Sequence, residues 1–226
     1  TGFGSIVIAL SLGTLFLPIA ELLPVLVPLN LALSGYLSIR QRAHIHWPTL
    51  LQSILPLMAL GTLLGYLLKP ALGSTTLQTL FGILIVCFAG RELWRLRPTA
   101  TAAAAVAAPA KTRGLMLAAG TTHGLFASGG PLLVYALAGT SLDKASLRAT
   151  LIAVWFSLNS LLTLVYLFDG SLLPSLPRLL HYLPVVGVGI VVGDWLHRRI
   201  DERQFRRLVF ALLAIIGAIL TLAAWP

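Results

Sequence analysis

The chain has 226 residues, of which 58% are hydrophobic and only 10% are charged, and its mean hydropathy is +0.92. A water-soluble core cannot bury that much apolar surface, so the composition excludes an ordinary soluble domain and predicts an integral membrane protein. The formal net charge of +9 does not indicate a nucleic-acid partner, because the basic residues cluster in short gaps between apolar runs, the pattern of the positive-inside rule.

The apolar runs predict eight membrane segments, since a helix that crosses the hydrocarbon core needs about 20 apolar residues. A stretch rich in alanine and proline, flanked by basic residues, separates the first four segments from the last four. We therefore expect a first transmembrane repeat over residues 1–97, a cytoplasmic linker over 98–113 and a second repeat over 114–226. The expected segments are 3–20, 22–39, 49–68, 75–95, 115–138, 146–168, 172–196 and 205–225.

The two halves share patterns that indicate a duplication. The motif Pro-x4-Gly-x3-Gly occurs at residues 56–65 and again at residues 184–193, each time inside an apolar run. Small residues at this spacing predict close helix contacts. Asn30 and Asn159 also lie at nearly the same offset in the second long segment of their halves. A duplicated membrane protein of this size is typical of a secondary transporter, whose binding site lies between the repeats.

The basic loops predict the orientation of the chain in the membrane. The linker and the loops after the second and seventh segments are rich in basic residues and should be cytoplasmic, whereas the loop around Asp169 should be outside. Eight full crossings would put the five arginines after segment seven outside. The conflict disappears if segment five enters and leaves on the cytoplasmic side, which also places Lys144 and Arg148 inside. Eight plain crossings, with one violation of the positive-inside rule, are the alternative.

Segment five contains residues that would allow such re-entry. Glycine and proline break helices, and we expect breaks at residues 120–124 and 128–131. By the repeat, segment one would re-enter from outside near Glu21. Each repeat then has three full spans and one further segment, and an odd number of crossings inverts the second copy. The expected fold is an all-α membrane protein of two homologous four-segment repeats, inverted relative to each other, with a broken or re-entrant first segment in each.

The broken segment is also the sharpest candidate binding site. Non-helical backbone at membrane depth is tolerated where it is buried in protein or lines a cavity, and free N–H groups at the start of a half-helix can hold an anion without a buried cation. A glycine-rich crossing that only packs closely against its neighbours is the alternative. The residues of this segment expected to contact a substrate are Thr121, Thr122, His123, Gly124, Ser128, Gly129 and Gly130.

Three polar side chains inside the spans have two readings each. His123 is the one histidine expected at membrane depth, where ionisable residues tend to be functional. It would donate to an anion or carry a coupled proton, or it would be a neutral histidine bonded to a nearby carbonyl. Asn30 and Asn159 would line the cavity, or they would only tie helices together by hydrogen bonds.

The sequence predicts neither an enzyme nor a metal or cofactor site. It contains no phosphate-binding Gly-x4-Gly-Lys-Ser/Thr motif, no His-Glu-x-x-His motif and no Ser/His/Asp arrangement. Cys87 is the only cysteine, and we expect it to pack within its span. His44 and His46 have no third metal ligand nearby and are expected in an interfacial loop.

The order of these motifs resembles the TauE/SafE sulfite exporter family of membrane transporters, also called TSUP. Residues 2–5 are similar to its first glycine motif, residues 30–65 follow the order of its first half, and residues 124–131 are similar to the glycine motif of its second half. The chain departs from the family pattern at Ser11, where many members have proline, and at Ala127, where glycine is common. The resemblance extends the expected site to Gly2, Gly4 and Ser5.

The resemblance implies a multi-pass protein of the bacterial inner membrane that transports small sulfur-containing anions, such as sulfite or organosulfonates. We expect a secondary transporter that works by alternating access, with the lipid bilayer and a small oxyanion as its partners. A proton or sodium ion as the coupling ion and a homo-oligomeric state are left open. An anion channel and a non-transporting membrane scaffold or assembly protein are the alternatives, and no nucleic acid is expected.

Overall fold

The computed structural model of the chain describes residues 5–96, 108–138, 140, 142–197 and 201–223. Across these ranges the protein is helical and contains no strand, which confirms the all-α class. The main helices are α1 (Ser5–Gly13), α2 (Ile19–Arg40), α3 (Leu55–Leu68), α4 (Ser74–Arg95), α5 (Pro109–Phe126), α6 (Gly130–Ala136), α7 (Lys144–Phe168), α8 (Leu176–His197) and α9 (Glu202–Ala223), and the short turns are η1 (Arg42–His44), η2 (Thr49–Ile54), η3 (Lys69–Ala71) and η4 (Leu173–Ser175).

Four helices in the described ranges are long and apolar enough to cross a membrane, namely Ile19–Arg40, Thr49–Ala71, Ser74–Arg95 and Lys144–Phe168. The second of these combines η2, α3 and η3. A helix of 22 residues is about 33 Å long, which matches the hydrocarbon thickness of a bilayer. The outer faces of these helices carry large apolar side chains that water would not tolerate in such numbers, and lipid is their natural solvent.

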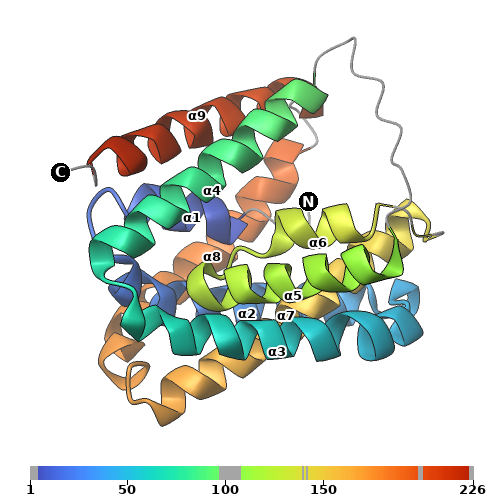
Figure 1. The fold of residues 1–226 in the computed structure, drawn as a ribbon, viewed down its shortest axis with the longest axis horizontal. Coiled ribbons are helices and arrows are strands. Elements are labelled where there is room, and N and C mark those ends of the chain that lie inside the picture. Colours follow the sequence, from blue (N-terminus) through green and yellow to red (C-terminus); the bar gives the residue numbers. More distant parts are fainter. Residues whose placement is uncertain (1–4, 97–107, 139, 141, 198–200, 224–226) are drawn as a thin grey trace.

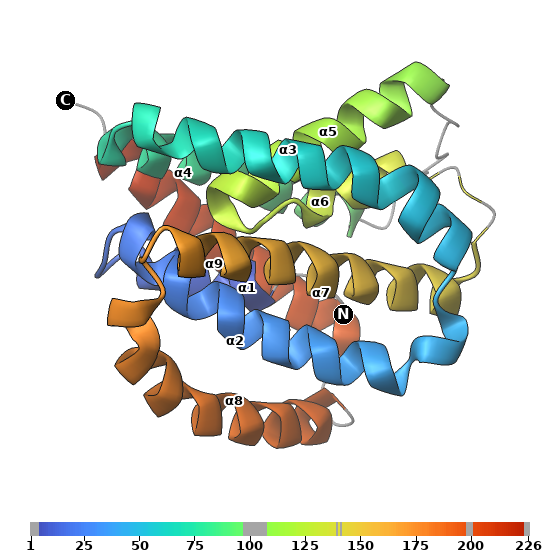
Figure 2. The ribbon, with the colours of Figure 1, turned by 90° about the horizontal axis from the view of Figure 1, so that it is seen from below.

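Two helices, α1 and α6, start near the middle of the molecule and run toward opposite ends (Figures 1 and 2). The nine-residue helix α1 begins near the centre and runs to the end at which α2 begins. Helix α5 comes in from the other end, the chain turns, and α6 runs back toward that same end. The turn follows α5 directly, and Gly129 lies against the carbonyl group of Ala119, two turns back along α5. The predicted break at residues 128–131 is therefore confirmed.

The predicted break at residues 120–124 is wrong, because α5 continues through Gly120 and Gly124 to Phe126. Both glycines are needed for close packing against α3. A Cβ atom at Gly120 would lie 2.8 Å from the Cα atom of Met58, and one at Gly124 would lie 2.7 Å from the backbone nitrogen of Tyr66. Both distances are shorter than the approach of non-bonded atoms, so only glycine allows these helices to lie so close.

The first Pro-x4-Gly-x3-Gly motif supplies the other side of this contact. A Cβ atom at Gly61 would lie 2.9 Å from the Cα atom of Gly120, and Gly65 faces the backbone of Thr121. The prediction of a small-residue helix contact is confirmed for this pair. It is not borne out at Gly189, where no atom lies within 4 Å of the position a Cβ would take, because α8 bows away from the other helices (Figure 2). The side chains from Gly193 to His197 are outside the described set.

The helix ends that carry basic residues gather at one end of the molecule, as Figures 1 and 2 show for the ends of α2 and α4 and the starts of α5, α7 and α9. Arg207 donates to the carbonyl oxygen of Leu96 at 3.1 Å, and the Arg91 guanidinium lies 4.8 Å from the ring centroid of Tyr135. The described basic residues at this end include Arg40, Arg42, Arg91, Arg95, Lys111, Arg113, Lys144, Arg148 and Arg207.

The opposite end contains a cluster that joins the two halves of the chain. The Tyr66 hydroxyl, in α3, donates to the Asp169 carboxylate, just after α7. The Lys69 ammonium lies 3.4 Å from the Tyr166 hydroxyl and 5.2 Å from the centroid of its ring. Partial burial opposes ionisation of Asp169, but hydrogen bonds from Ser171 and Tyr66 outweigh it and hold the pKa of this carboxyl below its usual value.

Two local expectations from the sequence need correction. Cys87 does not pack within the protein but lies exposed on α4, since the other side of that helix makes the contact with α9. Helix α5 begins at Pro109, so the last five residues of the expected linker are helical, as an N-terminal proline favours.

Candidate functional site

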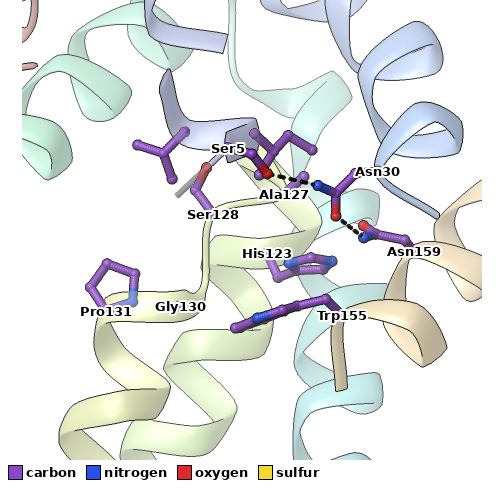
Figure 3. A pocket seen from close by; sticks show the side chains of 11 residues that line it. Ser5, Asn30, His123, Ala127, Ser128, Gly130, Pro131, Trp155 and Asn159 are labelled. Carbon is purple, nitrogen blue, oxygen red and sulfur yellow. Dashed lines mark hydrogen bonds between the residues drawn. The ribbon is translucent and has the colours of Figure 1, made fainter. Parts of the chain in front are cut away.

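A cavity of about 30 Å³ lies in the middle of the molecule, where α1, α2, α5, α6 and α7 meet. Asn30 lies near the midpoint of α2 and Asn159 just past the midpoint of α7, so the cavity lies near the middle of two candidate membrane spans. No Asp, Glu, Lys or Arg is among the described residues that line it. These residues are Ser5, Ile6, Val7, Asn30, His123, Ala127, Ser128, Gly130, Pro131, Trp155 and Asn159 (Figure 3).

Three of the lining side chains form a hydrogen-bonded chain across the two halves of the sequence. Asn159 donates from Nδ2 to Oδ1 of Asn30 at 2.8 Å, and Asn30 donates from Nδ2 to the Ser5 hydroxyl at 3.1 Å. The chain therefore links α7, α2 and the first residue of α1 (Figure 3). Oδ1 of Asn159 is buried and makes no hydrogen bond of ordinary geometry within the described residues, although the Asn159 side chain lies close enough to His123 for a weak one.

His123 and Trp155 form the other wall of the cavity. His123 is 1% exposed and Trp155 is 6% exposed, and the two rings stack with a centroid distance of 5.6 Å and an interplanar angle of 23° (Figure 3). The indole nitrogen of Trp155 has no hydrogen-bond partner within the described residues. The ring nitrogens of His123 make no hydrogen bond of ordinary geometry there, although the ring lies close enough to the Asn159 side chain for a weak one. Buried polar atoms without partners are rare in folded proteins and indicate a site that a ligand or water completes.

The turn between α5 and α6 brings backbone to the cavity. Ala127 adopts the left-handed conformation, with φ 52° and ψ 28°, which accounts for the frequent glycine at this position in the family that the sequence resembles. The Ser128 hydroxyl donates to the carbonyl oxygen of Phe126 at 2.8 Å and is thus already occupied. Gly130 and Pro131 then begin α6 at the cavity.

The start of α1 faces the cavity from the other side. Ser5, Ile6 and Val7 form the first described turn of this helix and all line the cavity. The first N–H groups of a helix have no partner within it, and the helix dipole places partial positive charge there. The cavity thus combines a helix N-terminus with buried side-chain donors, and this arrangement suits an anion.

The cavity gathers six of the residues expected from the sequence, namely Ser5, Asn30, His123, Ser128, Gly130 and Asn159. Four others lie elsewhere. Thr121 and Thr122 donate to carbonyl oxygens one turn back in α5, and Gly124 and Gly129 make the backbone contacts described above.

Gly2 and Gly4 lie outside the described residues.

Trp155 is absent from the residues that the sequence predicts for the site. A signal for it exists, since Trp155 precedes Asn159 by four residues and therefore shares its helix face. Ile6, Val7, Ala127 and Pro131 also line the cavity, but apolar residues inside a membrane segment give no such signal. Within the described part of the chain, no group of three His, Cys, Asp or Glu side chains is arranged to hold a metal ion.

Comparison with known proteins identifies the family. The family model described as Sulfite exporter TauE/SafE matches residues 1–220. The chain is also 31% identical over 195 residues to the probable inner membrane transporter protein TsaS of Comamonas testosteroni, a match that covers 85% of this chain and 78% of the relative. No solved structure matches the chain.

Proposed function

The chain belongs to the sulfite exporter TauE/SafE family of membrane transporters, and we propose that it carries small sulfur-containing anions across the membrane as a secondary transporter. Its relative is named a probable inner membrane transporter protein, and this chain is a multi-pass protein of the inner membrane. Sulfite and organosulfonates are the substrate classes that we assign. The observation that carries the proposal is the neutral cavity near the middle of two candidate membrane spans, lined by donors without partners.

The donors suit an anion that enters without a compensating cation. Burial of an ion is costly unless hydrogen bonds replace its hydration shell. The N-terminus of α1 supplies backbone N–H groups, and His123 and Trp155 supply side-chain donors. Gly130, which lines the cavity at the start of α6, leaves room for close approach of the anion. The charge of a small oxyanion can therefore be spread over several donors.

The size of the cavity favours the smaller substrates. A volume of about 30 Å³ corresponds to roughly two water molecules on the same measure. An inorganic oxyanion fits after a slight expansion, but an organosulfonate with a large organic group requires the helices around the cavity to separate. We therefore propose that sulfite fits the cavity better than the larger organosulfonates do.

Alternating access is the mechanism that we propose. Helices α1 and α6 start at the cavity and run to opposite ends of the molecule (Figure 1), as expected if the two repeats are inverted and segments one and five are re-entrant. Rocking of one repeat against the other would then open the cavity to each side in turn. A proton carried by His123 is the coupling ion that this geometry favours, because His123 is the only titratable side chain on the described cavity wall.

Counterflow of labelled sulfite in proteoliposomes tests the proposal. A carrier shows uptake stimulated by unlabelled sulfite inside, a channel shows uptake without this stimulation, and a scaffold moves nothing. Gly130→Val should abolish counterflow, because Gly130 lines the cavity and a larger residue there reduces the space for the anion. Gly187→Val is the matched control, since nothing lies within 4 Å of a Cβ at Gly187, and it should transport normally.

A further inference from the structure

The indole nitrogen of Trp155 is a buried donor for which the described residues offer no acceptor. The residue is 6% exposed, and Nε1 has no hydrogen-bond partner among the described residues. A buried donor without a partner destabilises a protein, and tryptophan at buried positions usually finds an acceptor. A phenylalanine at this position would avoid the penalty, so the N–H group itself requires an explanation.

The position of the ring points to the cavity as the place where the missing acceptor binds. Trp155 lines the cavity together with Asn159, one helical turn further along α7. The parallel stack against His123, at 5.6 Å, fixes the plane of the indole (Figure 3). The ring is thus held in one orientation before any ligand arrives, and a donor held in this way loses little entropy when it forms a hydrogen bond.

The chemistry of the indole limits what can satisfy it. Its N–H group is a donor only and does not titrate, whereas a neutral imidazole presents one donor and one acceptor. The partner of Nε1 must therefore be a hydrogen-bond acceptor. Because the indole does not titrate, this requirement is the same at every pH at which the protein is folded. An oxygen of an oxyanion meets this requirement, and a site built to bond such an atom discriminates strongly against ligands that lack it.

We propose that Trp155 is a specificity-determining residue that donates a hydrogen bond from Nε1 to an oxygen of the transported anion. This inference rests on the proposed function, because it assumes that the cavity binds an oxyanion. It adds that α7 contributes a direct ligand contact that is independent of pH, beside the helix N-terminus and His123. Hydrogen bonds to charged groups are the stronger ones in proteins, so loss of this donor should weaken sulfite binding by about 10- to 100-fold.

Isothermal titration of the purified full chain with sulfite tests the contact. The first variant is Trp155→Phe, which keeps an aromatic ring against His123 but lacks the donor. The second carries 3-benzothienylalanine at position 155, introduced by codon suppression, in which sulfur replaces the N–H group and the shape of the indole is kept. Trp94→Phe is the matched control, because Trp94 is 69% exposed and lies at the end of α4, outside the cavity lining.

The expected result is a 10- to 100-fold increase in the Kd for sulfite in both position-155 variants and an unchanged Kd in the control. Should Trp155→Phe fail to fold, the benzothienyl variant decides, since it preserves packing. Wild-type affinity in a folded position-155 variant overturns the contact and leaves the proposed function intact. Absence of sulfite binding and counterflow in the wild-type protein overturns both.

Discussion

Asn159 donates a hydrogen bond from Nδ2 to Oδ1 of Asn30 at 2.8 Å. The bond joins the middle of α7 to the middle of α2 across 129 residues of sequence, at the level of the cavity. The two asparagines therefore tie the halves of the chain together and line the cavity at the same time, so the two readings open from the sequence do not exclude each other.

The pair should show a measurable coupling energy. Hydrogen bonds between membrane helices contribute about 0.6 kcal/mol on average and up to about 1.7 kcal/mol. Asn30→Ala and Asn159→Ala should each destabilise the protein, and the double variant should be less destabilised than the sum by about that amount. Unfolding in bicelles measures the cycle. Strict additivity of the two changes would mean that the bond contributes nothing to stability.

Glycines at the contact between α3 and α5 should be far more sensitive to substitution than glycines on α8. A Cβ at Gly65 would overlap the backbone of Thr121, so Gly65→Ala forces the helices apart and should cost about 1–3 kcal/mol or more. Gly189→Ala meets no atom within 4 Å and should change stability by less than about 0.5 kcal/mol. Thermal unfolding of both variants in one detergent compares them, and equal effects would contradict the packing seen here.

The basic end of the molecule should be cytoplasmic. Lys144 begins α7 and Leu173 follows its other end, so the two positions should lie on opposite sides of the membrane. Single cysteines at 144 and 173, in a Cys87→Ser background, report this through an impermeant maleimide added to intact cells. Only position 173 should react. Reaction at both positions would rule out the orientation and the re-entry of segment five.

Transport should depend on pH through His123 if that side chain carries the coupled proton. His123 is the only titratable side chain on the described cavity wall, so its replacement should remove that dependence. His123→Gln keeps hydrogen-bonding atoms but cannot titrate, and it should flatten the profile of sulfite counterflow. His181→Gln, on the exposed face of α8, should keep the wild-type profile. An unchanged profile in active His123→Gln would assign the histidine a structural role only.

The hydrogen bond between Tyr66 and Asp169 should make the stability of the folded protein depend on pH in the acidic range. The pKa of Asp169 lies below its usual value in the folded protein, so its contribution is complete above the unfolded pKa of about 3.9 and is lost as the pH falls through the lower folded pKa. Tyr66→Phe removes the donor and should lower the melting temperature near pH 7 but much less at pH 3. Because Asp169 is exposed, the effect at pH 7 should be modest, about 1 kcal/mol or less. A Tyr66→Phe effect of the same size at both pH values would show that the charge of Asp169 plays no part.

Local features of the sequence sufficed for the membrane class, the all-helical fold, the basic end and the helix break at residues 128–131. These follow from composition, the length of apolar runs and the backbone preferences of glycine and proline, which act over a few residues. The equal offsets of Asn30 and Asn159 also pointed to the cavity, because a duplication places equivalent residues at equivalent depth.

Only the tertiary structure decided which residues share the cavity. Gly120, Gly129 and Gly130 cannot be told apart from the sequence pattern. In the structure, Gly120 and Gly129 pack against backbone carbonyl groups, and only Gly130 lines the cavity. Trp155 joins the site because α7 crosses beside His123, a contact between residues 32 positions apart in the chain. Such assignments depend on which face of a helix meets which neighbour, and in lipid every face of these segments can be apolar, so the hydrophobic pattern does not distinguish them.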